Sequence, residues 1–240
     1  MTKTKLFNGA SIACLSFILL PFAGLAQAPT PPLVNIGIFT TAVRDSFEVR
    51  IFSDASIPQT QGLMNATFTL RWDVAAGGTV DVASLAVDCG EYALVTNGEP
   101  VQSDGSYNYY TLNINGSGAL GTTCPITTSG APIAGFRMTN FTGCAALNIV
   151  DDGYTGSNNK DFYLSLGGID RTGSIYSTPL VVGFPADINA DGTVDVQDFL
   201  SLNGAFGNSC TGCPEDINDD GTVDVQDFLS LNGAFGTSCP

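Results

Sequence analysis

Two stretches near the C-terminal end, DINADGTVDVQDF (Asp187–Phe199) and DINDDGTVDVQDF (Asp216–Phe228), are almost the same sequence. The identity extends over Ala186–Cys210 and Glu215–Cys239, which differ only at the paired positions 186/215, 190/219 and 208/237. A near-perfect tandem duplicate predicts one structural unit that is used twice. From Asp187 onward the chain holds ten acidic residues and no basic one, so this segment needs a cation to offset the repulsion between its charges.

Oxygen-bearing side chains recur at fixed positions of each repeat, and a glycine, Gly192 or Gly221, stands at the sixth position, where the loop must turn sharply. Calcium takes about six to eight oxygen ligands, and donors that alternate along a curling loop converge on one point. The spacing therefore predicts two calcium sites of EF-hand type, with metal binding helping each loop to fold. The expected ligands are the side chains of positions one, three, five, nine and twelve and the carbonyl oxygen of position seven: Asp187, Asn189, Asp191, Thr193, Asp195 and Asp198 in the first repeat, and Asp216, Asn218, Asp220, Thr222, Asp224 and Asp227 in the second.

A short amphipathic helix is expected after each loop. In VQDFLSLNGAFG, Phe199, Leu202 and Phe206 follow at helical spacing and a glycine ends the pattern. No helix is expected before the loop, because VVGFPA contains Pro185 and has no helical period. A loop followed by one helix, duplicated over Asp187–Cys239, resembles a dockerin, the calcium-binding module that docks secreted proteins onto cohesin domains. Thrombospondin-type calcium repeats and an ordinary acidic turn are the alternatives.

The dockerin resemblance also implies which residues meet a protein partner. In dockerins, residues just after the metal ligands and along the following helix contact the cohesin. The corresponding residues here are Val196, Gln197 and Asn203 in the first repeat, and Val225, Gln226 and Asn232 in the second. Because the two sets are the same, either helix could present the same surface. Packing at the helix start is the competing interpretation for the two valines.

The body of the chain, residues 29–183, is predicted to be an antiparallel β-sandwich. FEVRIF (47–52) and MNATFTLRW (64–72) alternate apolar and polar residues with a period of about two, the pattern of half-buried strands. YNYYTLNI, IAGFRMTNF, AALNIV and DFYLSL are further strand candidates, separated by turn clusters such as SDGS and DDGYTGSNN. Many short strands without a long helical period favour a sandwich. The chain is thus mainly β, followed by a small α module over 184–240.

The body is expected to bind or display a ligand, and its sequence resembles two kinds of β-sandwich module. MNATFTLRWD and the later DFYLSLGGIDRTGSIYSTP resemble the cohesin-like and carbohydrate-binding sandwich modules of secreted bacterial proteins, so polysaccharide is a second expected partner. A sugar site on a sandwich needs exposed aromatic rings or polar residues, because aromatic faces pack against the apolar faces of sugars. The candidate rings are Trp72, Tyr107, Tyr109 and Tyr110, although Trp72 is in phase with the core positions of its strand.

Catalysis finds little support in the sequence. The chain has no histidine, which removes the nucleophile systems and metal centres that depend on one. Two carboxylates could still hydrolyse a glycosidic bond, but no motif pairs Asp73, Asp161 and Asp170. A non-catalytic docking protein in extracellular polysaccharide use is therefore expected, with a divergent glycoside hydrolase or a structural surface protein as alternatives.

The N-terminal end predicts export. Residues 1–28 hold two lysines, an apolar run from Ala10 to Leu25 and then Ala-Gln-Ala, the order of a secretory signal peptide; a lipoprotein-type signal ending at Cys14 is the weaker alternative. No later stretch has the roughly 20 apolar residues of a transmembrane helix. A secreted protein is expected, with any attachment to a cell surface made through a partner. Its net charge of -15 argues against nucleic acid as that partner.

An even number of cysteines remains after the signal, which in an exported chain favours disulfides. Three lie in the body and three in the tail, so the pairing is not fixed by the sequence. CTGC, which lies between the two loops, is expected to form a structural bridge rather than a redox site. The six residues are Cys89, Cys124, Cys144, Cys210, Cys213 and Cys239.

Overall fold

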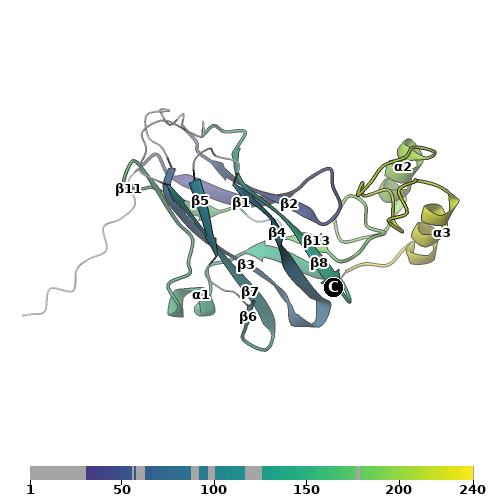
Figure 1. Ribbon diagram of the computed structural model, residues 1–240, viewed down its shortest axis with the longest axis horizontal. Helices are drawn as coiled ribbons and strands as arrows, with labels where there is room; N and C mark the ends of the chain where they lie inside the picture. The colour runs from purple at the N-terminus through teal and green to yellow at the C-terminus, as the bar shows by residue number, and fades with distance from the viewer. Residues whose placement is uncertain are drawn as a thin grey trace, which may run out of the picture.

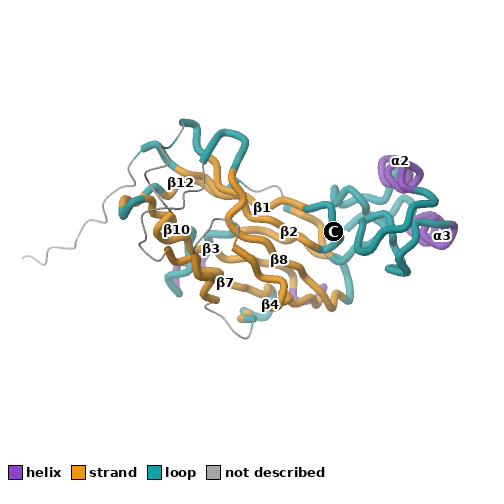
Figure 2. The backbone as a smooth tube through the Cα atoms, turned by 45° about the horizontal axis from the view of Figure 1, so that its top comes forward, coloured by secondary structure: helices purple, strands orange, loops and turns teal. Residues whose placement is uncertain are grey.

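The computed structural model describes residues 31–55, 57, 63–87, 92–96, 101–116, 126–176 and 179–239. These residues form a body of two β-sheets and a tail that carries two helices at one end of the molecule (Figures 1 and 2). The expected signal peptide, Cys89 and Cys124 lie outside the described residues. No helix within the described ranges is long and apolar enough to cross a membrane.

The first sheet has five strands in the order β12-β1-β2-β8-β4. Neighbouring strands are antiparallel except at one edge, where β1 and β12 run parallel. The sequence predicted an antiparallel sandwich, so the parallel pairing of β1 with β12 was not expected. It arises because the chain leaves the second sheet after β11 and β12 then runs beside β1 in the same direction. The strands are β1 Val34–Thr40, β2 Ser46–Phe52, β4 Gly77–Val87, β8 Ala131–Phe141 and β12 Thr172–Ile175.

The second sheet follows the order β11-β10-β3-β7-β5, with β6 beside β7, β9 beside β3 and β13 beside β9. Its longest ladder joins β3 to β7, from Asn65 opposite Asn115 to Asp73 opposite Tyr107. Every segment that the sequence predicted as a strand overlaps a strand of one of the two sheets, although Val150, Asp161 and Phe162 lie outside β9 and β10. The strands of this sheet are β3 Leu63–Asp73, β5 Tyr92–Thr96, β6 Gln102–Ser103, β7 Tyr107–Gly116, β9 Ala145–Ile149, β10 Tyr163–Leu166, β11 Ile169–Asp170 and β13 Leu180–Val182.

The hydrophobic core lies between the two sheets. Phe68, Leu70 and Trp72 alternate along β3 and are completely buried, packed in one cluster with residues of the first sheet such as Ile36 and Val49. Burying one such side chain stabilises the fold by about 1.5–3 kcal/mol. The indole Nε1 of Trp72 donates to the carbonyl oxygen of Gly77 at 2.8 Å, so its polar atom is satisfied inside the core.

One helix of the body was not predicted. The turn cluster DDGYTGSNN contains α1 (Gly153–Ser157), which begins after the capping residue Asp152. The Asp152 carboxylate accepts from the N–H groups of Tyr154 and Thr155, and its other oxygen lies 2.9 Å from Nη1 of Arg71. Burial raises the pKa of Asp152, but these hydrogen bonds outweigh it and lower the pKa overall. The cap, rather than helix propensity, therefore explains this helix.

The tail contains α2 (Val196–Ala205) and α3 (Val225–Ala234). Both follow an acidic loop, as predicted, and within the described residues no helix separates α1 from α2. Phe206, expected on the apolar face of the helix, instead lies just beyond its end and is 51% exposed. Gly207 follows at a φ of 84°, a left-handed conformation that ends the helix.

Candidate functional site

The first loop, defined here as Asp187–Asp198, closes around the carboxylate of its last residue. Asp198 is completely buried. Its Oδ1 accepts from the N–H groups of Ile188 at 2.8 Å and Asn189 at 3.1 Å, and its Oδ2 accepts from the N–H of Asp195 at 2.8 Å. The twelfth position of the loop is therefore held against the first positions.

Side-chain oxygens of positions one and three converge in the same loop. Oδ1 of Asp187 and Oδ1 of Asn189 both accept from the N–H of Asp191, at 3.1 and 2.9 Å. Burial raises the pKa of Asp187, the N–H groups of Gly192 and Asp191 lower it, and the charges of Asp198 and Asp191 raise it, for a net increase. The negative charges of positions five and twelve thus both act on the carboxylate at position one.

The second loop, defined as Asp216–Asp227, repeats this arrangement. Asp227 is completely buried, and its oxygens accept from the N–H groups of Asn218 and Asp224 at 3.1 and 2.8 Å. Oδ1 of Asp216 and Oδ1 of Asn218 share the N–H of Asp220, at 3.1 and 3.0 Å. Because most of these contacts recur in both copies, the arrangement follows from the repeated sequence.

The predicted ligands at positions nine and seven form other contacts in the structure. Asp195 and Asp224 accept from the N–H groups of the second helical residues and so cap α2 and α3, while the two threonines of position seven form isolated β-bridges with Ser238 and Ser209. Across the described ranges, no group of three or more His, Cys, Asp or Glu side chains converges as a metal site would require. In each loop the side-chain oxygens of positions one and three accept from one N–H, and the carboxylate of position twelve accepts from the N–H of position three. Carboxylate and amide oxygens of this kind fit the donor preference of calcium.

Each loop is held by the segment that follows the helix of the other repeat. The N–H of Val194 donates to the carbonyl of Thr237 at 2.9 Å, and the N–H of Val223 donates to the carbonyl of Asn208 at 2.9 Å. Both valines are completely buried in a second core, in which the rings of Phe199 and Phe228 pack edge to face at 6.2 Å. The two repeats therefore form one structural unit.

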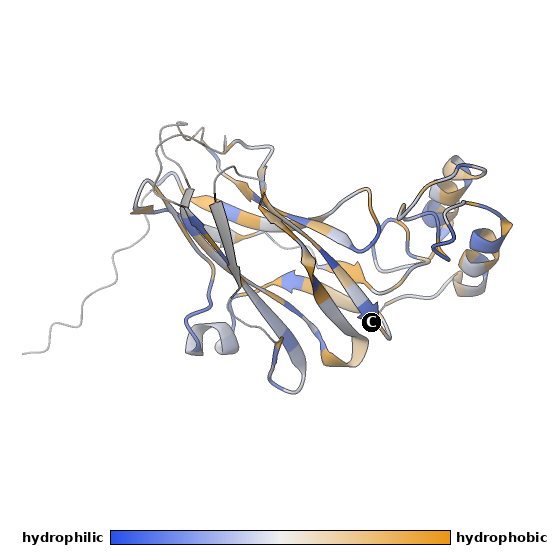
Figure 3. Ribbon diagram, in the orientation of Figure 1, coloured by the Kyte–Doolittle hydropathy of each residue, from blue (hydrophilic) through white to orange (hydrophobic). Residues whose placement is uncertain are grey.

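The expected partner-contact residues lie at the surface of the two helices. Val196 and Val225 are each 56% exposed, which argues against the packing interpretation, and their predicted polar companions Gln197, Asn203, Gln226 and Asn232 are exposed as well. Sequence reasoning missed Leu200 and Leu229, which lie one turn later and are 60% and 61% exposed. Both helices thus carry apolar and polar residues (Figure 3). The four-residue step from valine to leucine was the available signal.

The aromatic residues considered for a sugar site are mostly buried. Trp72, Tyr109 and Tyr110 are at most 2% exposed, so for these three the expectation is wrong. Tyr107 is 38% exposed, and the guanidinium of Arg71 lies 4.5 Å from the centre of its ring. These rings therefore form no open platform for a sugar.

The acids considered for catalysis have local structural roles. The Asp73 carboxylate accepts from the N–H of Ala75 and caps the short 3-10 helix Val74–Ala76, and the Asp170 carboxylate accepts from the N–H of Thr172. Asp161 contributes negative charge that raises the pKa of Asp151, for which burial is the larger cause. These contacts indicate no catalytic pair.

Two disulfides are formed by the described cysteines. Cys210 and Cys213 are joined within the tail, as expected of a structural CTGC bridge, while Cys144 of the body is joined to Cys239 of the tail. Cys210 and Cys239 occupy equivalent positions of the two repeats. The same repeat position therefore serves a local bridge in one copy and a tether to the sandwich in the other.

No protein-family model and no curated protein matches this sequence. Among solved structures, the chain is similar to the sixth cohesin of scaffoldin B from Acetivibrio cellulolyticus, crystallised with a Cel5 dockerin mutant, with 14% identity and a TM-score of 0.36 over 62% of this chain and 97% of the other. The seventh ScaB type I cohesin from Pseudobacteroides cellulosolvens gives 15% identity and a TM-score of 0.37 over 62% of this chain and 90% of the other. A type I cohesin–dockerin complex from Clostridium thermocellum gives 8% and 0.37 over 63% and 92%. Scores of this size establish neither family nor function, so the proposals below depend on the residues of this chain.

Proposed function

We propose that the tail is a calcium-dependent docking module of the dockerin type. Each loop binds one calcium ion, and the helices that follow meet a protein partner of the cohesin type. The observation that carries this proposal is repeated in both loops: the side chains of positions one and three share one N–H, and the carboxylate of position twelve accepts from the N–H of position three. Position twelve lies in the first turn of a helix that has exposed apolar residues.

Calcium supplies the positive charge that the tail lacks. The residues that would hold it include Asp187, Asn189 and Asp198 in the first loop and the same positions in the second. Mutual repulsion among carboxylates opposes loop closure, so a bound cation would stabilise the closed form. The loops therefore couple metal binding to the shape of the docking surface.

The docking surface consists of the two apolar residues on each helix, flanked by exposed amides. An exposed apolar step of four residues on one helix is the pattern by which a helix packs into a groove of another protein. The body is proposed to be a non-catalytic sandwich that binds or displays a ligand. The two disulfides support an oxidising, extracellular location.

A charge placed on both helices is expected to abolish docking. We predict that the double variant Val196→Asp/Val225→Asp loses affinity for a cohesin partner by at least about a hundredfold, because burying an unpaired carboxylate in an interface is costly. Each single variant keeps most of the affinity, since the other helix presents the same surface. The measurement is surface binding of the full chain to a panel of cohesin domains, in calcium and in EDTA.

Val82→Asp is the matched control, because Val82 is 52% exposed and belongs to β4 of the body. It should bind like the original protein. Absence of binding to every cohesin of the panel, or binding that is the same in EDTA, would contradict the proposed docking.

A further inference from the structure

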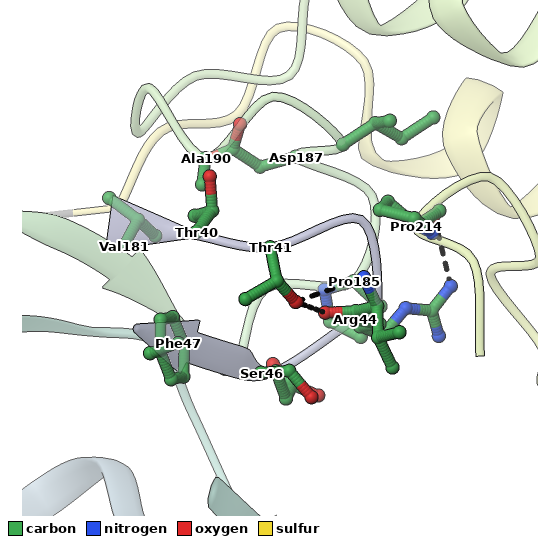
Figure 4. A pocket seen from close by; sticks show the side chains of 13 residues that line it. Thr40, Thr41, Arg44, Ser46, Phe47, Val181, Pro185, Asp187, Ala190 and Pro214 are labelled. Atoms are coloured by element: carbon green, nitrogen blue, oxygen red, sulfur yellow. Dashed lines mark hydrogen bonds between the residues drawn. The ribbon is translucent and has the colours of Figure 1, made fainter. Parts of the chain in front are cut away.

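A single arginine of the body reaches into the second loop. Arg44 lies in the turn between β1 and β2, and its side chain is only 9% exposed. Its guanidinium donates to the carbonyl oxygens of Ile217 at 2.9 Å and Pro214 at 3.1 Å, and also to that of Asp216. Figure 4 shows this side chain directed from the body toward the tail segment at Pro214. Arg44 of the body therefore forms hydrogen bonds with the backbone at the start of the second loop and just before it.

The same guanidinium meets the one residue by which the two loops differ. Nη1 of Arg44 lies 3.4 Å from Oδ1 of Asp219, whose counterpart in the first loop is Ala190. The backbone does not explain this difference, because Ala190 and Asp219 have almost the same φ, 58° and 59°. The two loops therefore differ in sequence only at the position where Asp219 places a carboxylate beside Arg44.

Arg44 also lines a cavity with Asp187 and Ala190, but among the described residues no ion pair joins a basic residue to the first loop. The tail contains no basic residue, and among the described residues the only ion pair to the tail is the one between Arg44 and Asp219. Asp219 is 65% exposed, so its ion pair alone contributes little. The charged hydrogen bonds of a buried guanidinium contribute more, because each backbone carbonyl accepts from a full positive charge.

We propose that Arg44 is a built-in counter-charge that docks the second loop on the sandwich. In the absence of calcium the second loop then stays folded, while the first loop depends on the metal. Two loops of nearly identical sequence are therefore inequivalent. The docking itself needs no calcium, whereas its consequence for calcium binding rests on the proposed function.

Hydrogen exchange of the full chain in EDTA tests this directly, with mass spectrometry of peptides that span position 190 or 219, since these differ in mass. In the original protein, the second loop is expected to exchange more slowly than the first. Arg44→Met should accelerate exchange of the second loop by at least about tenfold, the effect of losing one charged hydrogen bond. The first loop and β3 should be unchanged.

Two further variants make the test specific. Arg50→Met, which removes the arginine paired with Glu48 on β2, should leave both loops unchanged. Asp219→Ala gives the second loop the residue of the first, and it should produce a smaller acceleration confined to the second loop. This variant decides the question if Arg44→Met destabilises the whole chain.

Equal exchange of both loops in the original protein, or an unchanged second loop in both variants, would overturn the proposal. Adding calcium to Arg44→Met should restore the slow exchange of the second loop. If calcium changes exchange in neither protein, the proposed calcium function fails, while the comparison in EDTA still decides the role of Arg44.

Discussion

Replacing Asp198 by alanine is expected to unfold the first loop and to loosen helix α2. Three N–H groups, those of Ile188, Asn189 and Asp195, lose a completely buried carboxylate acceptor at once. Each hydrogen bond to a charged group contributes about 1.5–3 kcal/mol, so the tail should lose at least about 3 kcal/mol of its free energy of unfolding. Since whole domains are stable by only about 5–15 kcal/mol, a small unit cannot absorb this loss.

Thermal melting followed by circular dichroism, with hydrogen exchange of the same samples, measures this effect. Asp227→Ala should produce a similar but somewhat smaller loss in the second repeat, because its buried carboxylate accepts from two of the three equivalent N–H groups. Asp54→Ala, which removes an exposed carboxylate of the body, is the control and should leave the melt unchanged. A melt and a helix content of Asp198→Ala equal to those of the original protein would contradict the view that this carboxylate organises the loop.

Removing the tether between body and tail is expected to cost almost as much. Cys144 and Cys239 are separated by 95 residues, and a bridge across a loop of this size stabilises a protein typically by about 2–4 kcal/mol. The variant Cys144→Ser/Cys239→Ser should therefore unfold at a lower urea concentration. The N–H of Cys239 also donates to the carbonyl of Gly192, so exchange of the first loop should accelerate too.

Cys210→Ser/Cys213→Ser is the matched control, because it removes a bridge with a sequence separation of only 3. A shorter closed loop restricts the unfolded chain less, so the expected loss of stability is smaller. Equal urea midpoints for the original protein and the Cys144→Ser/Cys239→Ser variant would show that the tether does not stabilise the chain.

The strands could be predicted because burial on one face imposes a period of two, as along β3 from Phe68 to Trp72. The alternation could not reveal that both faces of β7 are covered. Tyr110 belongs to the core between the sheets, while Tyr109 is covered from outside by the ring of Tyr154, whose centre lies 3.9 Å away. Helix α1 was missed because its formation depends on the cap at Asp152 rather than on helix-forming residues.

The predicted ligand positions one, three and twelve are brought together because local sequence determines a tight loop. The contact of Arg44 with Ile217 joins residues 173 positions apart, and no local pattern announces it. The parallel pairing of β1 with β12 is likewise a product of tertiary arrangement. The only sequence feature related to the Arg44 contact was the difference between Ala190 and Asp219 in otherwise identical loops.

Calorimetric titration of calcium into the full chain tests the central claim most directly, with the variant Asp191→Ala/Asp220→Ala as comparison. Both replaced carboxylates occupy position five of their loops, where a calcium ligand is expected. The proposal predicts two ions bound per original chain, none bound by the variant, and a higher melting temperature in calcium for the original chain alone. Absence of calcium binding to the original chain, or the same thermal melt with and without calcium, would contradict it.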